Sequence, residues 1–368
     1  MTFEIKVSTE SKYLESQLSL APTLKADYLT QIESLANDVA LETFSKTTFM
    51  MIDVGSGGPS ARIISFSAEG YPKMGQKIEP EDGELESDFI ERIFNIASEK
   101  KIVPEVLAVF VDITAWGRLL ENHKDYSKEK ITDRVNAIRQ QTQAHKFGHF
   151  QLVSQADEGE RAQIALESKL KEDETFRAGL NIAHCEVVDG GRRSNQSRII
   201  KQSREFGEIE IKERLKKEPL EVVQKDCDNA FFNDIPEVDS EQVMAHPFFC
   251  GSHLYSLKQK DVVELLGKMG YDSKAWKLGQ VTVKAGDLLE AMEKALKKAN
   301  EKDQPGLVIT ISILKAYIAK RGAEIARMGE FTNAAGENFK VSHYVGAAIR
   351  EYKFHKDIAP LVKGIVNL

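Results

Sequence analysis

One stretch near the amino terminus restricts the fold more than any other part of the sequence. Residues 47–67 read TTFMMIDVGSGGPSARIISFS: an apolar run ends at Asp53, a glycine-rich segment follows, and a second apolar run resumes at Ala61. Glycine permits positive φ angles and close backbone approach, so this pattern predicts a strand, a tight turn and a returning strand. Backbone N–H groups gathered in such a turn suit an anion such as phosphate, although an ordinary hairpin without a ligand has the same pattern.

The same design recurs later in the chain. Residues 184–200, HCEVVDGGRRSNQSRII, again place an apolar strand before an aspartate (Asp189), paired glycines and a serine (Ser194). In both copies the aspartate can hold Mg²⁺ or Ca²⁺ through water, and the serine hydroxyl can donate to a phosphate oxygen. Two such loops facing each other would clamp a chain of phosphates.

Strands and helices alternate between the two loops. SDFIERIFNIASEK predicts an amphipathic helix, and VPEVLAVFVDIT predicts a buried strand. After them the pattern predicts a helix at 130–145, the strand FQLVS, the acidic turn QADEGE and a helix beginning near Arg161. This alternation indicates an α/β fold with a parallel or mixed sheet, in which ligands gather at the carboxyl ends of strands.

The remainder of the chain is predicted to be mainly helical. FGEIEIKERL suggests a continuation of the sheet that turns helical, and residues 226–257 suggest an irregular, aromatic, substrate-facing loop. Three helices then follow, and PGLVITISILKAYIAKRG is apolar enough to be the central one.

Composition restricts the class of protein. The 368 residues are 42% hydrophobic and 29% charged, which is globular, and the formal net charge of -7 argues against an extended nucleic-acid footprint. Three widely spaced cysteines match neither a disulfide framework nor a zinc site, which favours a reducing compartment. Because no secretory signal or membrane span is apparent, we expect a cytoplasmic protein without a membrane partner; the oligomeric state stays open.

Four predicted strand ends carry polar residues suited to phosphate chemistry: DVGSGGPSAR, DITAWGRLL, SQADEGE and DGGRRSNQ. Hydrolysis of a phosphoanhydride needs cationic charge, oriented donors and a group that positions water, and these stretches offer each. In this order and spacing they resemble the apyrase conserved regions of the nucleoside triphosphate diphosphohydrolase family, within the actin-like ATPase superfamily that also includes exopolyphosphatases. SHYVGAAIREY is similar to the closing helix of that family, so the resemblance extends from Thr47 to Tyr352.

The resemblance implies two actin-like (ribonuclease H-like) lobes with mixed sheets and a nucleotide cleft between them. Residues 1–155 plus 337–368 would form the N-terminal lobe and residues 156–336 the C-terminal lobe. The implied activity is metal-dependent hydrolysis of nucleoside tri- or diphosphates, with Mg²⁺ or Ca²⁺ as the cofactor.

The site residues are carried over by matched position. Glu158 would be the base that positions water, and Thr114 and Arg118 would belong to the second region of the site. Asp53 and Asp189 would organise the water shell of the metal. The implied phosphate-binding residues are Ser56, Gly57, Gly58, Ser60, Gly190, Gly191 and Ser194.

This sequence departs from the family in the third and fourth regions. No aromatic residue follows DEG, and Arg192 and Arg193 stand between the paired glycines and Ser194. Two further hypotheses therefore stay open. One is an exopolyphosphatase or guanosine pentaphosphate phosphohydrolase, a related family with similar loops. The other is a nucleotide-binding regulatory module without turnover.

Overall fold

The computed structural model describes most of the region that carries these motifs. Its described residues are 48–55, 58–67, 69–98, 106–113, 128–145, 147–177, 179–191, 194–200, 206–237, 244–332, 336, 338–353 and 356. Contacts divide the chain into the unit Lys46–Arg350 and a second unit of Met1–Ser45 with Glu351–Leu368. The helices predicted before residue 47 lie outside the described residues, and the two predicted lobe boundaries stay predictions.

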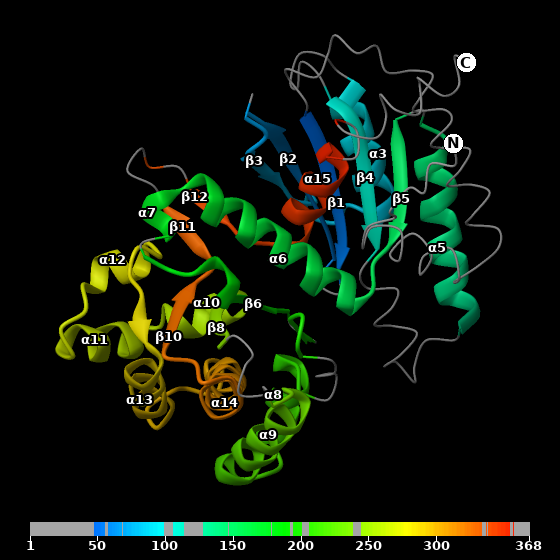
Figure 1. Cartoon of the computed structure of the whole chain (residues 1–368). Coiled ribbons are helices and arrows are strands. Elements are labelled where there is room, and N and C mark those ends of the chain that lie inside the picture. The colour runs from blue at the N-terminus through cyan, green and yellow to red at the C-terminus, as the bar shows by residue number, and fades with distance from the viewer. Residues whose placement is uncertain are drawn as a thin grey trace, which may run out of the picture. The chain divides into compact units, whose positions relative to one another are not determined.

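The first sheet contains the strand–turn–strand unit predicted from the opening stretch. Its strand order is β3-β2-β1-β4-β5 (Figure 1). The strands are β1 (Thr48–Gly55), β2 (Gly58–Phe66), β3 (Pro72–Ile78), β4 (Val106–Ile113) and β5 (Gly148–Leu152). β1 pairs antiparallel with β2 and parallel with β4, and β5 continues the parallel part, so the sheet is mixed.

Alternation along β1 separates two faces of this sheet. Met50, Ile52 and Val54 share one core cluster with α3 (Glu86–Ser98) and α5 (Lys128–Gln143). The intervening side chains belong to the opposite face because successive residues of a strand alternate. On that face the Phe49 ring packs edge-on against Phe110 at 5.6 Å. Asp53, with the same parity as Phe49, therefore ends β1 on the face away from α3.

The second sheet repeats this arrangement. Its order is β7-β6-β8-β10-β9, with β6 antiparallel to β7 and parallel to β8. The strands are β6 (Cys185–Gly190), β7 (Asn195–Gln196), β8 (His246–Gly251), β9 (Val283–Lys284) and β10 (Ile325–Met328). Each sheet thus has an antiparallel hairpin followed by parallel strands, as expected from the repeated sequence pattern, and the second sheet adds β9 as an antiparallel edge strand.

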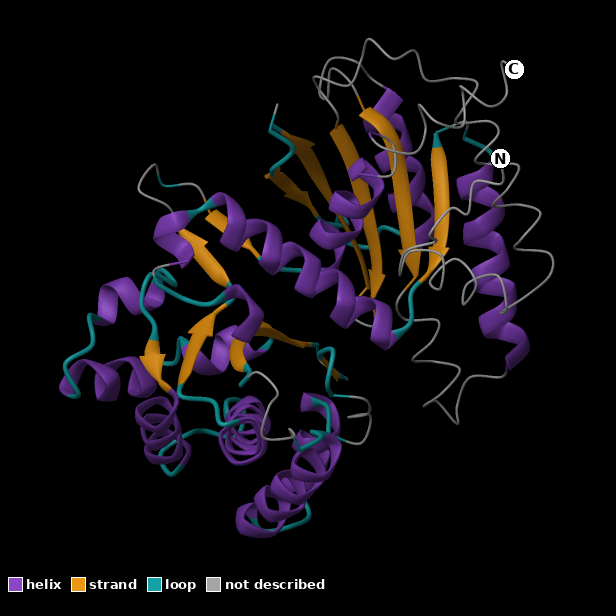
Figure 2. Ribbon diagram, viewed as in Figure 1, coloured by secondary structure: helices purple, strands orange, loops and turns teal. Residues whose placement is uncertain are grey.

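Helices cover both faces of the second sheet (Figure 2). α14 (Gln304–Arg321) is buried along most of its length and contacts β8, which confirms that it is central. α10 (His253–Leu257), α13 (Ala285–Leu296), α8 (Glu208–Leu215) and α9 (Leu220–Asp234) pack against α14. The other face carries α6 (Gln155–Glu172), which contacts β6 and continues into α7 (Glu174–Arg177).

The remaining elements complete this part of the chain. They are the short helix η2 (Ile182–His184), α11 (Lys260–Lys268), α12 (Ser273–Lys277), β11 (Glu330–Thr332), β12 (Asn338–Lys340) and α15 (His343–Lys353).

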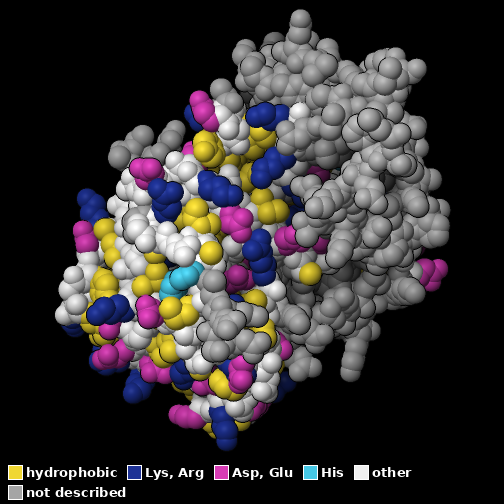
Figure 3. All heavy atoms as spheres, viewed as in Figure 1, with side chains coloured by type: hydrophobic (Ala, Val, Ile, Leu, Met, Phe, Trp, Pro, Cys, Tyr) yellow, Lys and Arg dark blue, Asp and Glu magenta, His cyan; other side chains and the backbone are white. Residues whose placement is uncertain are grey.

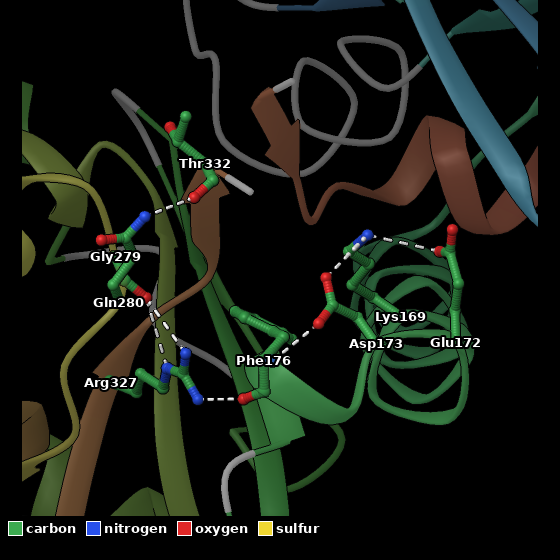
Figure 4. Close-up of polar contacts among 8 residues, drawn as sticks. All are labelled: Lys169, Glu172, Asp173, Phe176, Gly279, Gln280, Arg327 and Thr332. Atoms are coloured by element: carbon green, nitrogen blue, oxygen red, sulfur yellow. Dashed lines mark hydrogen bonds and ion pairs between the residues drawn. The ribbon is translucent and has the colours of Figure 1, made fainter. Parts of the chain in front are cut away.

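A buried arginine fastens α7 to the second sheet (Figure 4). Arg327 of β10 donates to the Phe176 carbonyl of α7 and, at 3.2 Å, to the Gly279 carbonyl. Its guanidinium also lies 4.3 Å from the centre of the Phe176 ring. Burial lowers the pKa of Arg327 to about 10, so the side chain stays charged at neutral pH. Because α6 runs directly into α7, this contact also restrains the end of α6 that is distant from Glu158.

The structure corrects three local predictions. FGEIEIKERL forms the helix α8 and no strand. Residues 226–257 contain the end of α9, β8 and α10, so most of the expected aromatic loop is regular structure. α6 begins at Gln155 rather than near Arg161, because Ser154 and Asp157 form a reciprocal capping box.

Among the described residues, no helix is long and apolar enough to cross a membrane. The face seen in Figure 3 mixes lysine and arginine with aspartate, glutamate and apolar side chains. The three cysteines are free thiols and are buried.

Candidate functional site

The two strand–turn–strand units place their aspartates at equivalent positions. Asp53 lies opposite Ser60 of β2, and Asp189 lies opposite Gln196 of β7. On the other side, Asp53 is aligned with Asp112 at the end of β4. The equivalent neighbour of Asp189 is Cys250 of β8. Each aspartate therefore stands where the carboxyl end of a parallel strand meets a hairpin, the usual position for ligand-binding residues in α/β sheets.

A buried ion pair links the first sheet to α6. Arg161 Nη1 donates to Asp112 Oδ2 at 2.8 Å, and Arg161 Nη2 donates to Gln151 Oε1 of β5 at 2.8 Å. The Arg161 side chain is 0% exposed and that of Asp112 is 1% exposed. Burial raises the pKa of Asp112, and the Arg161 guanidinium opposes that shift. This pair fixes the first turns of α6 against the ends of β4 and β5.

Glu158 lies in the first turns of α6 and is buried. Gln196 Nε2 donates to Glu158 Oε2 at 2.5 Å and to Ser194 Oγ at 3.0 Å. Glu158 and Ser194, which were predicted from different motifs, are therefore joined through Gln196, which was not predicted. Gln196 belongs to β7, and Ser194 belongs to the second glycine-rich turn. The amide holds the Glu158 carboxylate in one orientation, which suits a residue that positions water.

A histidine from the closing helix lies beside one of the predicted aspartates. His343 is the first residue of α15, is 8% exposed, and has Nε2 3.6 Å from Asp53 Oδ1. Burial alone would lower the pKa of its imidazole, but neighbouring carboxylates outweigh burial and raise that pKa to about 9. These carboxylates are those of Asp53, Glu158 and Asp189. The Asp53 carboxylate is paired directly with this imidazole.

The second glycine-rich turn is packed against α10. A Cβ on Gly190 would lie 2.7 Å from both His253 Cδ2 and Ser252 Oγ. The Gly191 N–H donates to the Ser194 carbonyl at 2.7 Å and closes the turn. Glycine at position 190 is therefore required by packing, whatever ligand the turn binds, and the Gly191 N–H is already used inside the turn.

The first glycine-rich turn is described only in part. Gly58 has a φ of +99° with open space where a Cβ would be, and Ser60 is half-buried. The other predicted residues of these regions lie outside the described residues: Ser56, Gly57, Thr114, Arg118, Arg192 and Arg193.

Direct metal ligands are not assembled in the described part of the chain. There, no group of three or more histidine, cysteine, aspartate or glutamate side chains is arranged to hold a metal ion. Asp53 is 25% exposed, and it is aligned with Asp112 of the neighbouring strand. Carboxylates without a direct three-ligand cluster fit a hydrated Mg²⁺ or Ca²⁺ held through water.

Several residues of this site were missed from sequence. Gln196 is predictable in hindsight because it pairs across the hairpin with Asp189. Arg161 and His343 gave weaker signals: an arginine one turn after Glu158, and a histidine at the start of the closing helix. Nothing in the local sequence indicates that Arg161 contacts Asp112 or that His343 contacts Asp53.

Comparisons with known proteins show the fold. No protein-family model and no curated protein matches the sequence. Among solved structures, the Aquifex aeolicus member of the Ppx/GppA protein family has a TM-score of 0.51 and 15% identity, covering 83% of this chain and 97% of that one. A type II variant of the Aquifex aeolicus Ppx/GppA phosphatase has a TM-score of 0.51, 13% identity and coverages of 83% and 99%. A third structure, of the Aquifex aeolicus PPX-GPPA enzyme, has a TM-score of 0.50, 14% identity and coverages of 83% and 99%.

These likenesses confirm the predicted actin-like α/β fold with two mixed sheets. The apyrase family itself is not among the three structures, so that narrower resemblance is not confirmed. The chain has the fold seen in Ppx/GppA structures.

Proposed function

We propose that this chain hydrolyses phosphoanhydride bonds and releases inorganic phosphate. One observation carries the proposal: the Gln196 amide bonds both Glu158 and Ser194, and Gln196 lies opposite Asp189 across the second hairpin, so residues predicted from two separate motifs are joined. Carboxylates at the ends of two hairpins, beside hydroxyl and glycine positions, suit a site for phosphate, cation and water. The likeness to Ppx/GppA structures supports the same class of reaction.

Glu158 has the central role in this proposal. Its carboxylate is buried and oriented by the Gln196 amide, so it can accept a hydrogen bond from a water molecule and aim that water at phosphorus. Ser60 and Ser194 are described hydroxyl residues near the turns of the two hairpins, and they would donate to phosphate oxygens. Thr114 and Arg118 complete the proposed site.

Asp53 and Asp189 would hold the water shell of Mg²⁺ or Ca²⁺. When bound, such an ion would supply positive charge to the phosphate oxygens as negative charge develops there.

Long polyphosphate or guanosine pentaphosphate is the substrate class that we favour over ordinary nucleoside di- and triphosphates. The basis is the fold: three Ppx/GppA structures are covered over 97–99% of their length. The apyrase-type reaction on nucleoside di- and triphosphates is the second candidate, supported by the motif order from Asp53 to Ser194. We also propose a cytoplasmic location, which three buried free thiols fit.

A substrate panel tests the proposal. Purified chain is incubated with long-chain polyphosphate, guanosine pentaphosphate, ATP or ADP, each with Mg²⁺, with Ca²⁺ or with EDTA, and phosphate release is measured. We expect release that needs a divalent cation and is fastest with polyphosphate or guanosine pentaphosphate. Fastest release from ATP or ADP would select the apyrase-type reaction instead. No release from any substrate, together with calorimetric binding of a nucleotide, would replace hydrolysis by the regulatory-module hypothesis.

A further inference from the structure

The small hairpin formed by β11 and β12 is fastened to the carboxyl end of the second sheet. The N–H of Val341, directly after β12, donates to the Gly329 carbonyl at 2.8 Å. The Gly329 N–H in turn donates to the Phe249 carbonyl of β8 at 2.8 Å. A Cβ on Gly329 would lie 2.0 Å from Cys250 Sγ, and Cys250 is the strand neighbour of Asp189. The end of β12 therefore returns to the strand end that carries the second predicted aspartate.

The same strand also contacts the first sheet. The backbone N–H of Lys340 donates to Met74 Sδ of β3 at 3.4 Å. Three residues later, His343 Nε2 lies 3.6 Å from Asp53 Oδ1. Three residues of chain span at most about 11 Å, so the backbone of Lys340 lies within that distance of the histidine beside Asp53. Lys340 is thus held by backbone contacts close to both hairpins of the candidate site.

The Lys340 side chain belongs to the face of the small hairpin that is turned toward α10. Lys340 pairs with Glu330 across the hairpin, and residues directly opposite each other in an antiparallel pair share a face. The Glu330 carboxylate accepts from Lys258 of α10 at 2.7 Å and from Asn338 at 2.9 Å. The first residue of α10 packs against Gly190 of the second glycine-rich turn. This face of the hairpin therefore belongs to the surroundings of the candidate site.

The ammonium of Lys340 has no ion-pair partner within the part of the chain that the structure describes. Lys258 forms the ion pair with Glu330, and Lys340 is half-buried. A structural lysine in such a place would be expected to pair with a carboxylate, whereas a lysine that binds an anion keeps its charge available. An ammonium and a phosphate oxygen form a charge-assisted hydrogen bond, which is stronger than one between neutral groups.

We propose that Lys340 binds a further phosphate group of the substrate, beyond the phosphate that is released. The chain would then prefer anions in which several phosphates are linked in a row over anions with a single phosphate. The word substrate rests on the function proposed above, whereas binding of a linked phosphate anion by Lys340 does not require turnover.

Binding of an anion that resists hydrolysis tests the inference. The affinity of the full chain, with Mg²⁺ present, is measured by calorimetry for inorganic phosphate and for a methylene-bridged analogue of tripolyphosphate. The variants are Lys340→Gln, which removes the charge, and Lys340→Arg, which keeps it. We expect Lys340→Gln to weaken binding of the analogue by about fivefold or more and binding of inorganic phosphate by less. Lys340→Arg should stay close to wild-type affinity.

A second lysine offers a matched control. Lys284 is exposed in the short strand β9, at the edge of the second sheet opposite to β7, and it too forms no ion pair with the described residues. Lys284→Gln should leave the affinity for the analogue unchanged. Equal affinity of Lys340→Gln and the wild type for the analogue would overturn the inference. An equal loss for the analogue and inorganic phosphate, or an equal loss in Lys284→Gln, would overturn it as well.

Two further results keep the inference separate from the proposed hydrolysis. If Lys340→Gln does not fold, Lys340→Met, which has a long side chain without charge, must show the same loss. A wild-type chain that does not bind the analogue would also overturn the inference. Absence of phosphate release from the whole substrate panel, with the expected loss in Lys340→Gln, would refute hydrolysis and leave Lys340 as an anion-binding residue. Phosphate release together with unchanged affinity in Lys340→Gln would do the reverse.

Discussion

Substitution of Gly346 by alanine should damage both the stability and the activity of the chain. A Cβ at this position would lie 1.7 Å from the Arg161 carbonyl oxygen, and real Cβ contacts are essentially never under 3.0 Å. The helices α6 and α15 would have to separate by at least 1.3 Å, the difference between these two distances. The obstacle is backbone, which cannot move aside as the end of a flexible side chain can.

The expected magnitude follows from two opposing effects. Overpacking of this kind costs about 1–3 kcal/mol, occasionally more. Alanine in a helix interior is favoured over glycine by about 0.5–1 kcal/mol, which offsets part of that cost. Because the overlap is severe, we expect a net loss of about 2 kcal/mol in the free energy of unfolding. Glu158 and His343 lie near this contact on α6 and α15, so kcat for phosphate release should fall as well.

Urea unfolding of Gly346→Ala beside Gly286→Ala makes the test specific. Gly286 is exposed in α13, and nothing lies within 4 Å of its added Cβ. Alanine there should leave the midpoint unchanged or raise the stability by about 0.4–1 kcal/mol. Equal midpoints for Gly346→Ala and the wild type would refute the close packing of α6 and α15.

Two further predictions concern buried charged and titratable groups. Asp112→Asn leaves the buried Arg161 guanidinium without its carboxylate, so urea unfolding should show a loss of about 3–5 kcal/mol, and a loss under 1 kcal/mol would contradict the buried pair. Burial lowers the pKa of His253 to about 3, below the ordinary 6.5, so the unfolded chain binds this proton first and stability should fall as the pH drops from 6.5 toward 3. In thermal unfolding between pH 4 and 7, the stability of His253→Asn should decline less steeply with falling pH than that of the wild type. Parallel curves would contradict the assignment of this pH dependence to His253. The shift of the His253 pKa limits the contribution to stability to about 5 kcal/mol.

The two hairpins that end in Asp53 and Asp189 are encoded locally, and the structure contains both. Asp53 and Asp189 were predicted because an apolar run, paired glycines and a returning run reveal a hairpin within about 20 residues. The start of α6 was misplaced because QADEGE was interpreted as a turn, although Ser154 and Asp157 have the spacing of a capping box. The strand expected in FGEIEIKERL was wrong because its short alternation is outweighed by helix-forming residues and by packing of α8 on α14.

The long-range contacts could not be predicted in the same way. Arg161 reaches Asp112 across 49 positions of sequence, and His343 approaches Asp53 from the opposite end of the described chain. Gly346 has no local turn to form; it is needed only because α6 lies against α15. Such contacts depend on how separate elements pack, and a single sequence records only the residue types that make the packing possible.

The most direct test of the central claim compares two glutamates of the same helix. Glu158 is buried and bonded to Gln196, whereas Glu160 is exposed two residues later in α6. With the best substrate of the panel and Mg²⁺, Glu158→Gln should lower kcat for phosphate release by about 10²–10⁴-fold with the fold intact, and Glu160→Gln should match the wild type. A Glu158→Gln protein that releases phosphate as fast as Glu160→Gln would contradict the assignment of Glu158 and with it the proposed site.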